Sequence, residues 1–226
     1  GILNLWMHTA VETAAQHASL TSIHGRRFLV GIGVSHALLI DRKLEAGAYQ
    51  QPMAHTRSFL DALDAAAVPL AVEDRALAAL GPKMLELAAT RTAGVHPYLV
   101  TPEHTRVARE AVGPDALVAT EQGVVLETDP DQARSIARTN LAHYFALPNY
   151  TNNWKRLGFL DDDIADGGSD RLIDALVVWG DEEAIAARVQ EHRDAGASHV
   201  CVQVLTNNPT ALPLQQWRVL APALIG

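Results

Sequence analysis

The chain has 226 residues, of which 48% are hydrophobic and 19% charged, and its formal net charge at pH 7 is -8. This composition is typical of a folded globular protein, and the lack of Lys/Arg clusters excludes sequence-independent binding to nucleic acid or anionic membranes. No apolar run is long enough to span a membrane, and the single cysteine, Cys201, excludes an intrachain disulfide, so we expect a cytoplasmic protein.

Short β-branched or apolar runs alternate with amphipathic helical patterns along the chain. The first run, GILNLW, opens the sequence without an initiating Met, so we expect the chain to begin inside a longer protein. Strands that alternate with helices predict parallel β/α units. The six expected strands cover residues 1–6, 27–33, 75–80, 95–100, 116–126 and 199–205.

Helical periodicity fills the segments between these strands, and capping residues mark several helix starts. Thr101 before Pro102 and Asp129 before Pro130 each combine a favoured N-cap with proline at the first helical position. The expected helices cover residues 9–23, 52–66, 83–93, 102–112, 130–147, 169–180 and 181–196.

The segment at residues 147–169, LPNYTNNWKRLGFLDDDIADGGS, interrupts the alternation. We interpret it as an insertion with a short helix around residues 152–157, either a surface excursion or a lid over a pocket. A final helix is expected at residues 212–224, and all elements together predict a single domain over residues 1–226.

The stretch FLVGIGVSHA, at residues 28–37, is half of a dinucleotide-binding fingerprint. Gly31 and Gly33 follow an apolar strand, but His36 stands where the third glycine is required. We expect instead a strand whose carboxyl end presents Ser35 and His36, because ligands of parallel β/α folds bind at those ends. Further polar segments expected after strands lie at residues 4–8, 81–83, 98–101, 121–122 and 203–206.

A second motif, ALGPKMLELAA, runs from a strand through a Gly-Pro turn directly into a helix. The amides of Gly81, Lys83 and Met84 then lie at a helix N-terminus, which is either a phosphate cradle or an ordinary capped turn. Neither a metallohydrolase histidine motif nor a G-x-S-x-G nucleophile elbow is present, so we expect no metal site and no serine nucleophile of that kind.

Five stretches in the same order resemble the luciferase-like monooxygenase superfamily, and more narrowly its actinobacterial oxidoreductases that use the deazaflavin coenzyme F-420. The resemblance implies an α/β fold, a (β/α)8 TIM barrel of the bacterial-luciferase type. The first strand here matches the family's third, so the first two β/α units are expected to be missing from this chain. The stretches are GRRFLVGIGVSHA, RALAALGPKMLELAATRTAGVHPYLVTPEHT, VVLETDPDQARSIAR, LPNYTNNWKRLGF and DEEAIAARVQEHRDAGASHVCVQVL.

The resemblance implies an oxidoreductase that transfers a hydride between coenzyme F-420 and a small organic substrate. An FMN-dependent monooxygenase of the same fold and a non-catalytic, flavin-binding degenerate barrel are the alternatives. A homodimer is an option that the sequence leaves open.

By position, the resemblance also assigns roles to individual residues. His36 matches the site of an acid/base group beside the deazaflavin ring, and a non-proline cis peptide is implied at Gly1–Ile2 or Ile2–Leu3. The implied cofactor-binding residues are Gly1, Ile2, Leu3, Asn4, Ser35, Gly81, Lys83 and Met84, and the substrate pocket is assigned to His96, Tyr98 and Gln203.

Overall fold

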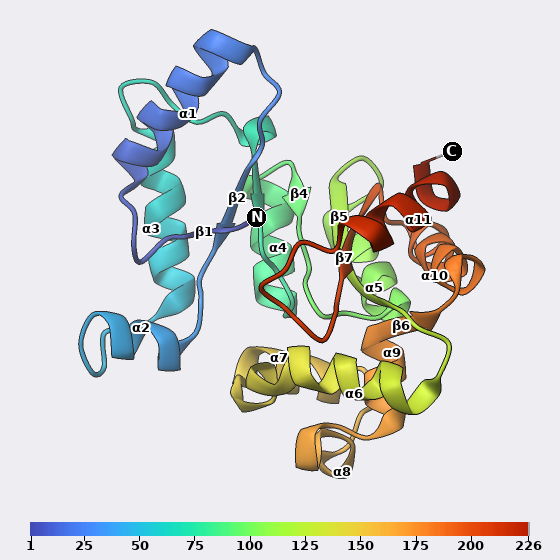
Figure 1. Cartoon of the computed structure of the whole chain (residues 1–226). Coiled ribbons are helices and arrows are strands. Elements are labelled where there is room, and N and C mark those ends of the chain that lie inside the picture. Colours follow the sequence, from blue (N-terminus) through green and yellow to red (C-terminus); the bar gives the residue numbers. More distant parts are fainter. Residues whose placement is uncertain (226) are drawn as a thin grey trace. The chain divides into compact units, whose positions relative to one another are not determined.

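A computed structural model describes residues 1–225, which divide into two compact units (Figure 1). Unit 1 contains residues 1–96 and 110–117, and unit 2 contains residues 97–109 and the chain from residue 118 onward. Each unit is built around parallel strands joined by helices, so the expected α/β class is confirmed. The single domain expected over residues 1–226 stays a prediction.

The sheet of unit 1 has four parallel strands in the order β1–β2–β3–β4. Because all four run the same way, their carboxyl ends lie at one edge of the sheet. Leu3 pairs with Ile32, and Leu77 pairs with both Ile32 and Val95. The strands are β1 (Leu3–Asn4), β2 (Val30–Gly33), β3 (Arg75–Leu77) and β4 (Gly94–Val95).

Three helices of unit 1, which begin at Ala10, Pro52 and Pro82, start within one residue of the predicted positions, and a fourth, which begins at Ala37, was not predicted. The side chain of Thr9 caps the first helix and forms a capping box with Glu12. The helices α1 and α3 lie side by side (Figure 1). The elements are α1 (Ala10–His24), α2 (Ala37–Lys43), α3 (Pro52–Asp64), a 3-10 turn (Val72–Asp74) and α4 (Pro82–Arg91).

The two glycines of β2 are explained by close packing against the start of the chain. A Cβ atom on Gly31 would lie 2.6 Å from the carbonyl oxygen of Gly1, and one on Gly33 would overlap the Cγ2 atom of Ile2. The close approach of Gly1 and Ile2 therefore accounts for both glycines without a dinucleotide.

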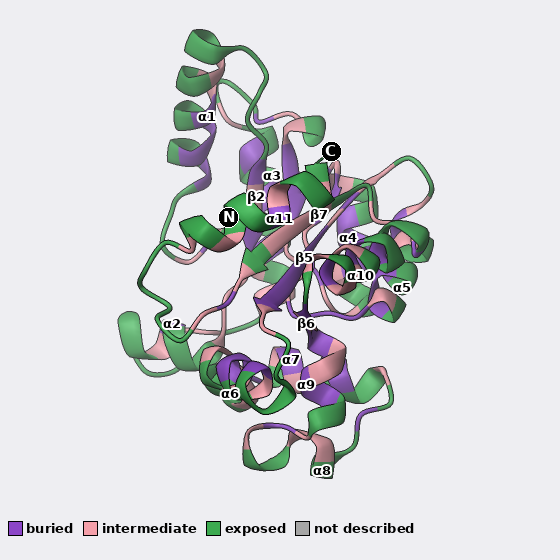
Figure 2. Cartoon of the chain, turned by 45° about the vertical axis from the view of Figure 1, so that its right-hand side comes forward, coloured by how far each residue is buried: buried purple, intermediate pink, exposed green. Residues whose placement is uncertain are grey.

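Unit 2 is centred on β5 (Leu117–Leu126), which belongs to this unit from Val118 onward and pairs in parallel with β6 (Val177–Gly180) and β7 (His199–Val204). The strands β5 and β6 are largely buried (Figure 2). Val124 of β5 packs with buried apolar side chains of β6 and of two helices, and these form a hydrophobic core. The other members are Val178, Ile185 and Leu220.

The helices around β5 to β7 also follow the capping signals. The side chain of Asp129 accepts a hydrogen bond from the Gln132 amide (2.9 Å), and Thr101 accepts one from His104 (3.4 Å). The elements are α5 (Pro102–Val112), α6 (Pro130–Leu141), η2 (Ala142–Ala146), α7 (Pro148–Arg156), α8 (Asp161–Ile164), η3 (Ala165–Gly167), α9 (Asp170–Leu176), α10 (Glu182–Asp194) and α11 (Leu214–Ile225).

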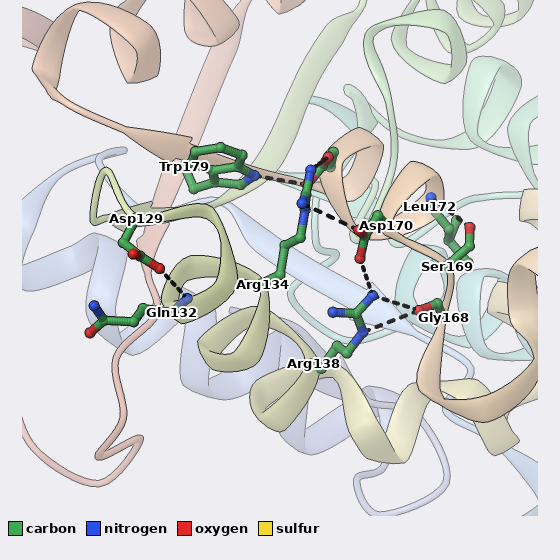
Figure 3. A network of polar contacts seen from close by, with 10 residues as sticks. Asp129, Gln132, Arg134, Arg138, Gly168, Ser169, Asp170, Leu172 and Trp179 are labelled. Carbon is green, nitrogen blue, oxygen red and sulfur yellow. Dashed lines mark hydrogen bonds and ion pairs between the residues drawn. The ribbon is translucent and has the colours of Figure 1, made fainter.

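The inserted segment is tied to α6 by a network of arginine and aspartate side chains (Figure 3). Arg138 donates to the Gly168 carbonyl and pairs with Asp170 (2.6 Å). Arg134 pairs with Asp174 (2.6 Å), whose other oxygen accepts a hydrogen bond from the Trp179 indole (2.8 Å). The segment is thus folded onto α6, with α7 replacing the shorter helix that the sequence predicts.

One predicted helix is wrong in its second half. The run expected to be helical at residues 169–180 is helix α9 only as far as Leu176, and Val177–Gly180 form β6. Two adjacent valines and a tryptophan favour a strand, and pairing with β5 decides the outcome. The described residues therefore contain seven strands instead of six.

Candidate functional site

The polar residues after β2 in unit 1 are held by aromatic side chains. The Trp6 indole donates to the Val34 carbonyl (2.8 Å), and the Tyr49 hydroxyl donates to the Ser35 carbonyl (3.3 Å). Ser35 has φ of 57°, an uncommon conformation for a residue other than glycine. His36 is half-buried and occupies the N-cap position of α2, where its side chain makes no capping hydrogen bond.

The first strand of unit 1 differs from what the resemblance implies. All peptide bonds of the described residues are trans, including Gly1–Ile2 and Ile2–Leu3, so the expected cis peptide is not present. Neither bond precedes proline, and a cis bond at such a position costs about 2.5–4 kcal/mol. The side chain of Asn4 accepts a hydrogen bond from the Trp6 amide (3.0 Å).

The turn between β3 and α4 has the predicted form, but one of its three amides already donates a hydrogen bond within the helix. Gly81 is the N-cap of α4 and Pro82 its first residue, and no side chain caps this helix end. The Met84 amide donates to the Gly81 carbonyl (3.1 Å) within the first turn. Of the three amides assigned to a phosphate, that of Met84 is therefore engaged by the helix itself.

Unit 2 contains a cavity of about 190 Å³ beside β5 and β7. The ladder places Glu121 next to Cys201 and Gly123 next to Gln203. Alternate residues of a strand point to opposite faces, so Glu121 and Gly123 share one face of β5. The cavity is lined by Tyr98, Leu99, Glu121, Gly123, Asn140, Leu141, His143, Tyr144, Gln203, Leu205 and Pro209.

Glu121 is the most unusual side chain of this cavity. It is only 6% exposed, and neither carboxyl oxygen has a hydrogen-bond partner of normal geometry among residues 1–225. Burial raises the pKa of Glu121 to about 8, and the nearby Leu99 amide opposes this shift only in part. Burial favours the neutral form of a carboxyl group, and the hydrogen bond from the Leu99 amide does not outweigh it, so Glu121 holds a proton near neutral pH.

Three tyrosine rings surround this carboxyl group. The Tyr144 hydroxyl donates to the Tyr98 hydroxyl (3.1 Å), which in turn donates to Oε1 of Gln203 (3.1 Å). The ring of Tyr150 lies edge-on to those of Tyr98 and Tyr144. Burial, with a further contribution from the charge of Glu121, raises the pKa of Tyr98, so the phenol stays protonated.

The loop that carries Tyr98 is fixed from two sides. The Glu121 amide donates to the Pro97 carbonyl (3.0 Å), and the indole of the fully buried Trp154 donates to the Leu99 carbonyl (3.1 Å). Leu99 has φ of 53°, which is strained for a bulky residue. The inserted helix α7 thus supports the cavity wall through Trp154.

The opposite face of β5 carries a separate polar network that is fully satisfied. His192 of α10 bonds through one ring nitrogen to Gln122 (2.7 Å) and through the other to Thr105 (2.8 Å). Burial, assisted by the charge of Arg188, lowers the pKa of His192 to about 4. This network is structural, because all its groups are buried and paired.

The expected site residues divide between the two units. His36, Ser35, His96, the first strand and the α4 turn lie in unit 1, whereas Tyr98 and Gln203 lie in unit 2 and contact each other through a hydrogen bond. Sequence reasoning placed Glu121 at a strand end without assigning it a role. It lies mid-strand, and the signal was an acid within LVATEQGVVL, a strand that is apolar on either side of the central Thr120, Glu121 and Gln122.

The free energy of unfolding is expected to fall between about pH 6.5 and 8 because of Glu121. Its pKa in the folded state is raised above the ordinary value, so its stabilising contribution is present at low pH and is lost as pH approaches 8. The lowered pKa of His192 acts in the opposite sense only below about pH 6.5. Chemical denaturation at several pH values should show a slope of up to about 1.4 kcal/mol per pH unit.

Glu121→Gln should remove that slope, and Glu110→Gln, the same change at an exposed position of α5, should leave it. If the free energy of unfolding of Glu121→Gln still falls with pH over this range, another group causes the slope. The titratable groups that face Glu121 are Tyr98, Tyr144, Tyr150, Cys201 and the cavity-lining His143.

Within residues 1–225, no cluster of His, Cys, Asp or Glu side chains has the arrangement of a metal site. Across the same residues, no helix combines the length and apolar character that crossing a membrane requires.

Parallel β/α units with polar residues after the strands are the framework of many barrel enzymes. The profile of the family described as luciferase-like monooxygenase matches residues 1–199, and the chain belongs to this family. A comparison with curated proteins finds no match.

Solved structures of similar fold confirm the luciferase-type barrel class. An F-420-dependent secondary alcohol dehydrogenase in complex with an F-420-acetone adduct has a TM-score of 0.70 at 12% identity, covering 96% of this chain and 76% of that chain. A coenzyme F-420-dependent tetrahydromethanopterin reductase from Methanopyrus kandleri has a TM-score of 0.66 at 17% identity, covering 100% and 81%. An EDTA monooxygenase from Chelativorans sp. BNC1 has a TM-score of 0.69 at 13% identity, covering 98% and 71%.

Proposed function

We propose that the protein is an oxidoreductase that transfers a hydride between coenzyme F-420 and a small organic substrate. The observation that carries this proposal is the likeness, over 96% and 100% of the chain, to two structures described as F-420-dependent enzymes. The resemblance of the sequence motifs to actinobacterial F-420 oxidoreductases supports the same cofactor.

Unit 1 has features that suit a phosphate-bearing deazaflavin. The N-terminus of α4 lacks a side-chain cap and carries Lys83, so the Gly81 turn offers both a positive helix end and a cation to a phosphate. We assign Gly81 and Lys83 to the phosphate, without Met84, whose amide donates within the first turn, and Ser35 together with residues 1–4 to the ring. When bound, F-420 supplies the hydride acceptor or donor.

His36 is the group proposed to manage the proton on the cofactor side. It lies in the short segment between the end of β2 at Gly33 and the start of α2, and its imidazole is not needed to cap α2. An imidazole changes protonation near neutral pH, as such a role requires. We assign the substrate pocket to His96, Tyr98 and Gln203.

An equilibrium binding titration tests which of the two cofactors the protein prefers. We expect F-420 to bind more tightly than FMN, seen as quenching of deazaflavin fluorescence when protein is added. Stoichiometric FMN binding without any response to F-420 would reverse the expected order of the two affinities.

That reversal would favour the second candidate, an FMN-dependent monooxygenase, which the likeness to the EDTA monooxygenase supports. Absence of turnover despite flavin binding would favour a non-catalytic, degenerate barrel.

Gly81→Val is expected to weaken F-420 binding by crowding the phosphate turn. Gly81 has φ of -87°, which valine also adopts, so the variant should fold. Lys83→Ala should weaken binding less, and mainly at low salt, because a side-chain charge is screened. Lys43→Ala on the exposed end of α2 is the charge control. Unchanged F-420 affinity in folded Gly81→Val would place the phosphate elsewhere.

A further inference from the structure

The cavity beside β5 and β7 contains a buried carboxyl group whose charge its surroundings do not balance. Every residue that lines this cavity belongs to unit 2. Glu121 is 6% exposed, and its hydrogen-bond partner among the described residues is the Leu99 amide. A carboxylate has about four acceptor positions, so one amide leaves most of them open. None of the described lining residues is Lys or Arg, and a buried charge without a counter-charge is unfavourable.

Several hydrogen-bond donors that line the cavity are used within the protein, whereas acceptors remain. The amide group of Asn140 donates to the carbonyls of Ile136 (2.9 Å) and Thr206 (3.0 Å), which leaves its Oδ1 atom as an acceptor. One of the two lining tyrosine hydroxyls donates to the other, which donates to Oε1 of Gln203. That oxygen can accept one more hydrogen bond. Together with the carboxyl group of Glu121, these atoms suit a ligand that brings donors.

We propose that this cavity binds a small primary alkylammonium ion, with the charged group beside Glu121 and the alkyl part against the apolar lining. The three N–H donors of such an ion match the acceptor groups of Glu121, Asn140 and Gln203. The cavity of about 190 Å³ has room for several non-hydrogen atoms, because a water molecule takes about 30 Å³ in the liquid. The apolar lining consists of Leu99, Leu141, Leu205 and Pro209.

Other classes of ligand fit this cavity less well. A carboxylate or phosphate would lie beside the Glu121 carboxyl group without a Lys or Arg to hold it. An uncharged ligand would leave the carboxylate without a counter-charge, and a quaternary ammonium ion has no N–H donor. The rings of Tyr98 and Tyr144 favour a cation in addition, because the face of an aromatic ring attracts positive charge.

This inference goes beyond the proposed function, because the binding uses unit 2 alone and requires neither F-420 nor hydride transfer. Tyr98 and Gln203 are also assigned to the substrate pocket, so an amine bound here competes with the substrate.

Binding of the ammonium ion is coupled to the proton of Glu121. Burial raises the pKa of this carboxyl group to about 8, so it is mostly protonated at pH 7. The ammonium ion favours the carboxylate, so the proton leaves to the solvent when the ion binds. The affinity should therefore rise with pH up to about 8, by about tenfold per pH unit below that value. The other titratable groups that face Glu121 are Tyr98, Tyr144, Tyr150, Cys201 and His143.

Infrared titration of the full chain without cofactor tests the proposal, with n-propylammonium chloride as the probe. The protonated carboxyl band of Glu121 should disappear with a midpoint near pH 8, be missing in Glu121→Gln and persist in Glu110→Gln. Saturating n-propylammonium should lower this midpoint by at least about one pH unit. Sodium chloride at the same concentration, and 1-propanol, which has nearly the same shape without the charge, should leave the midpoint in place.

Calorimetric titration with n-propylammonium at pH 8 measures what the acceptor groups contribute. Glu121→Gln should weaken binding at least about tenfold and remove its dependence on pH. This variant should fold, because a glutamine amide has the size and shape of a protonated glutamate carboxyl group. Asn140→Leu should keep the infrared titration of Glu121 and weaken binding about tenfold, because it removes one acceptor for a charged donor.

The outcomes separate this inference from the proposed function. An unchanged midpoint with n-propylammonium, or an equal shift with sodium chloride or 1-propanol, would overturn it. Undiminished binding to folded Glu121→Gln would also overturn it, because the cation would then bind elsewhere. Deazaflavin fluorescence in the same samples measures F-420 binding separately. A response to F-420 with an unchanged midpoint would refute the ammonium site and leave the proposed function intact, and the opposite pair of results would support the ammonium site and refute the cofactor assignment.

Discussion

His36→Ala will lower turnover by at least about a hundredfold while F-420 affinity stays within a few-fold of wild type. A group that moves a proton beside the hydride contributes to the chemical step and little to cofactor binding. The variant should fold, because the imidazole makes no capping hydrogen bond to α2 and is only half-buried. Steady-state kinetics and a separate fluorescence titration give the two quantities, with His24→Ala at the exposed end of α1 as the control.

The same two measurements, turnover and F-420 affinity, can also give the opposite result. Weaker F-420 binding with a modest change in turnover would mean that His36 only packs beside the cofactor. Near-normal turnover of the folded variant would move the proton transfer to His96 and Tyr98.

Trp154→Ala is expected to lower the free energy of unfolding by about 3–5 kcal/mol, the range for removing a large buried aromatic side chain. Trp154 is 0% exposed, packs near the rings of Phe145 and Tyr150, and donates its indole N–H to the Leu99 carbonyl. Chemical denaturation measures the loss. Trp217→Ala on α11, where the side chain is 43% exposed, should cost much less.

Trp154→Phe separates packing from the hydrogen bond. It keeps a buried ring and should cost about 1 kcal/mol for the lost hydrogen bond to Leu99, beyond the smaller ring volume. Because that bond holds the loop beside Glu121, the pH dependence of unfolding that Glu121 causes should also change. A Trp154→Ala loss no greater than that of Trp217→Ala would contradict the role of α7 as a support of the cavity.

Most helices of this fold were predictable because their signals are local, whereas α2 and α8 were not predicted. The Thr101–Pro102 start of α5 and the Asp129–Pro130 start of α6 act within one turn of the chain, and both are found where the sequence places them. The strand β6 was not predictable in this way. Its valines suit a helix end or a strand, and only pairing with β5 distinguishes the two.

The site shows the same division between local and long-range information. Ser35 and His36 follow their strand as predicted, because the end of a strand is a local feature. The state of Glu121 depends on rings contributed by the β4–α5 loop, η2 and α7, which the sequence does not bring together. Its pKa is therefore a property of tertiary packing, although an acid in the middle of a strand marks the position.

The central claim, hydride transfer to F-420, is tested most directly by following the absorbance of the oxidised deazaflavin when 2-butanol is added to protein and F-420. The account predicts a loss of this absorbance that needs both alcohol and protein and is nearly abolished in His36→Ala. Unchanged absorbance with 2-butanol, together with FMN-dependent oxygen consumption in the presence of a flavin reductase, would contradict it.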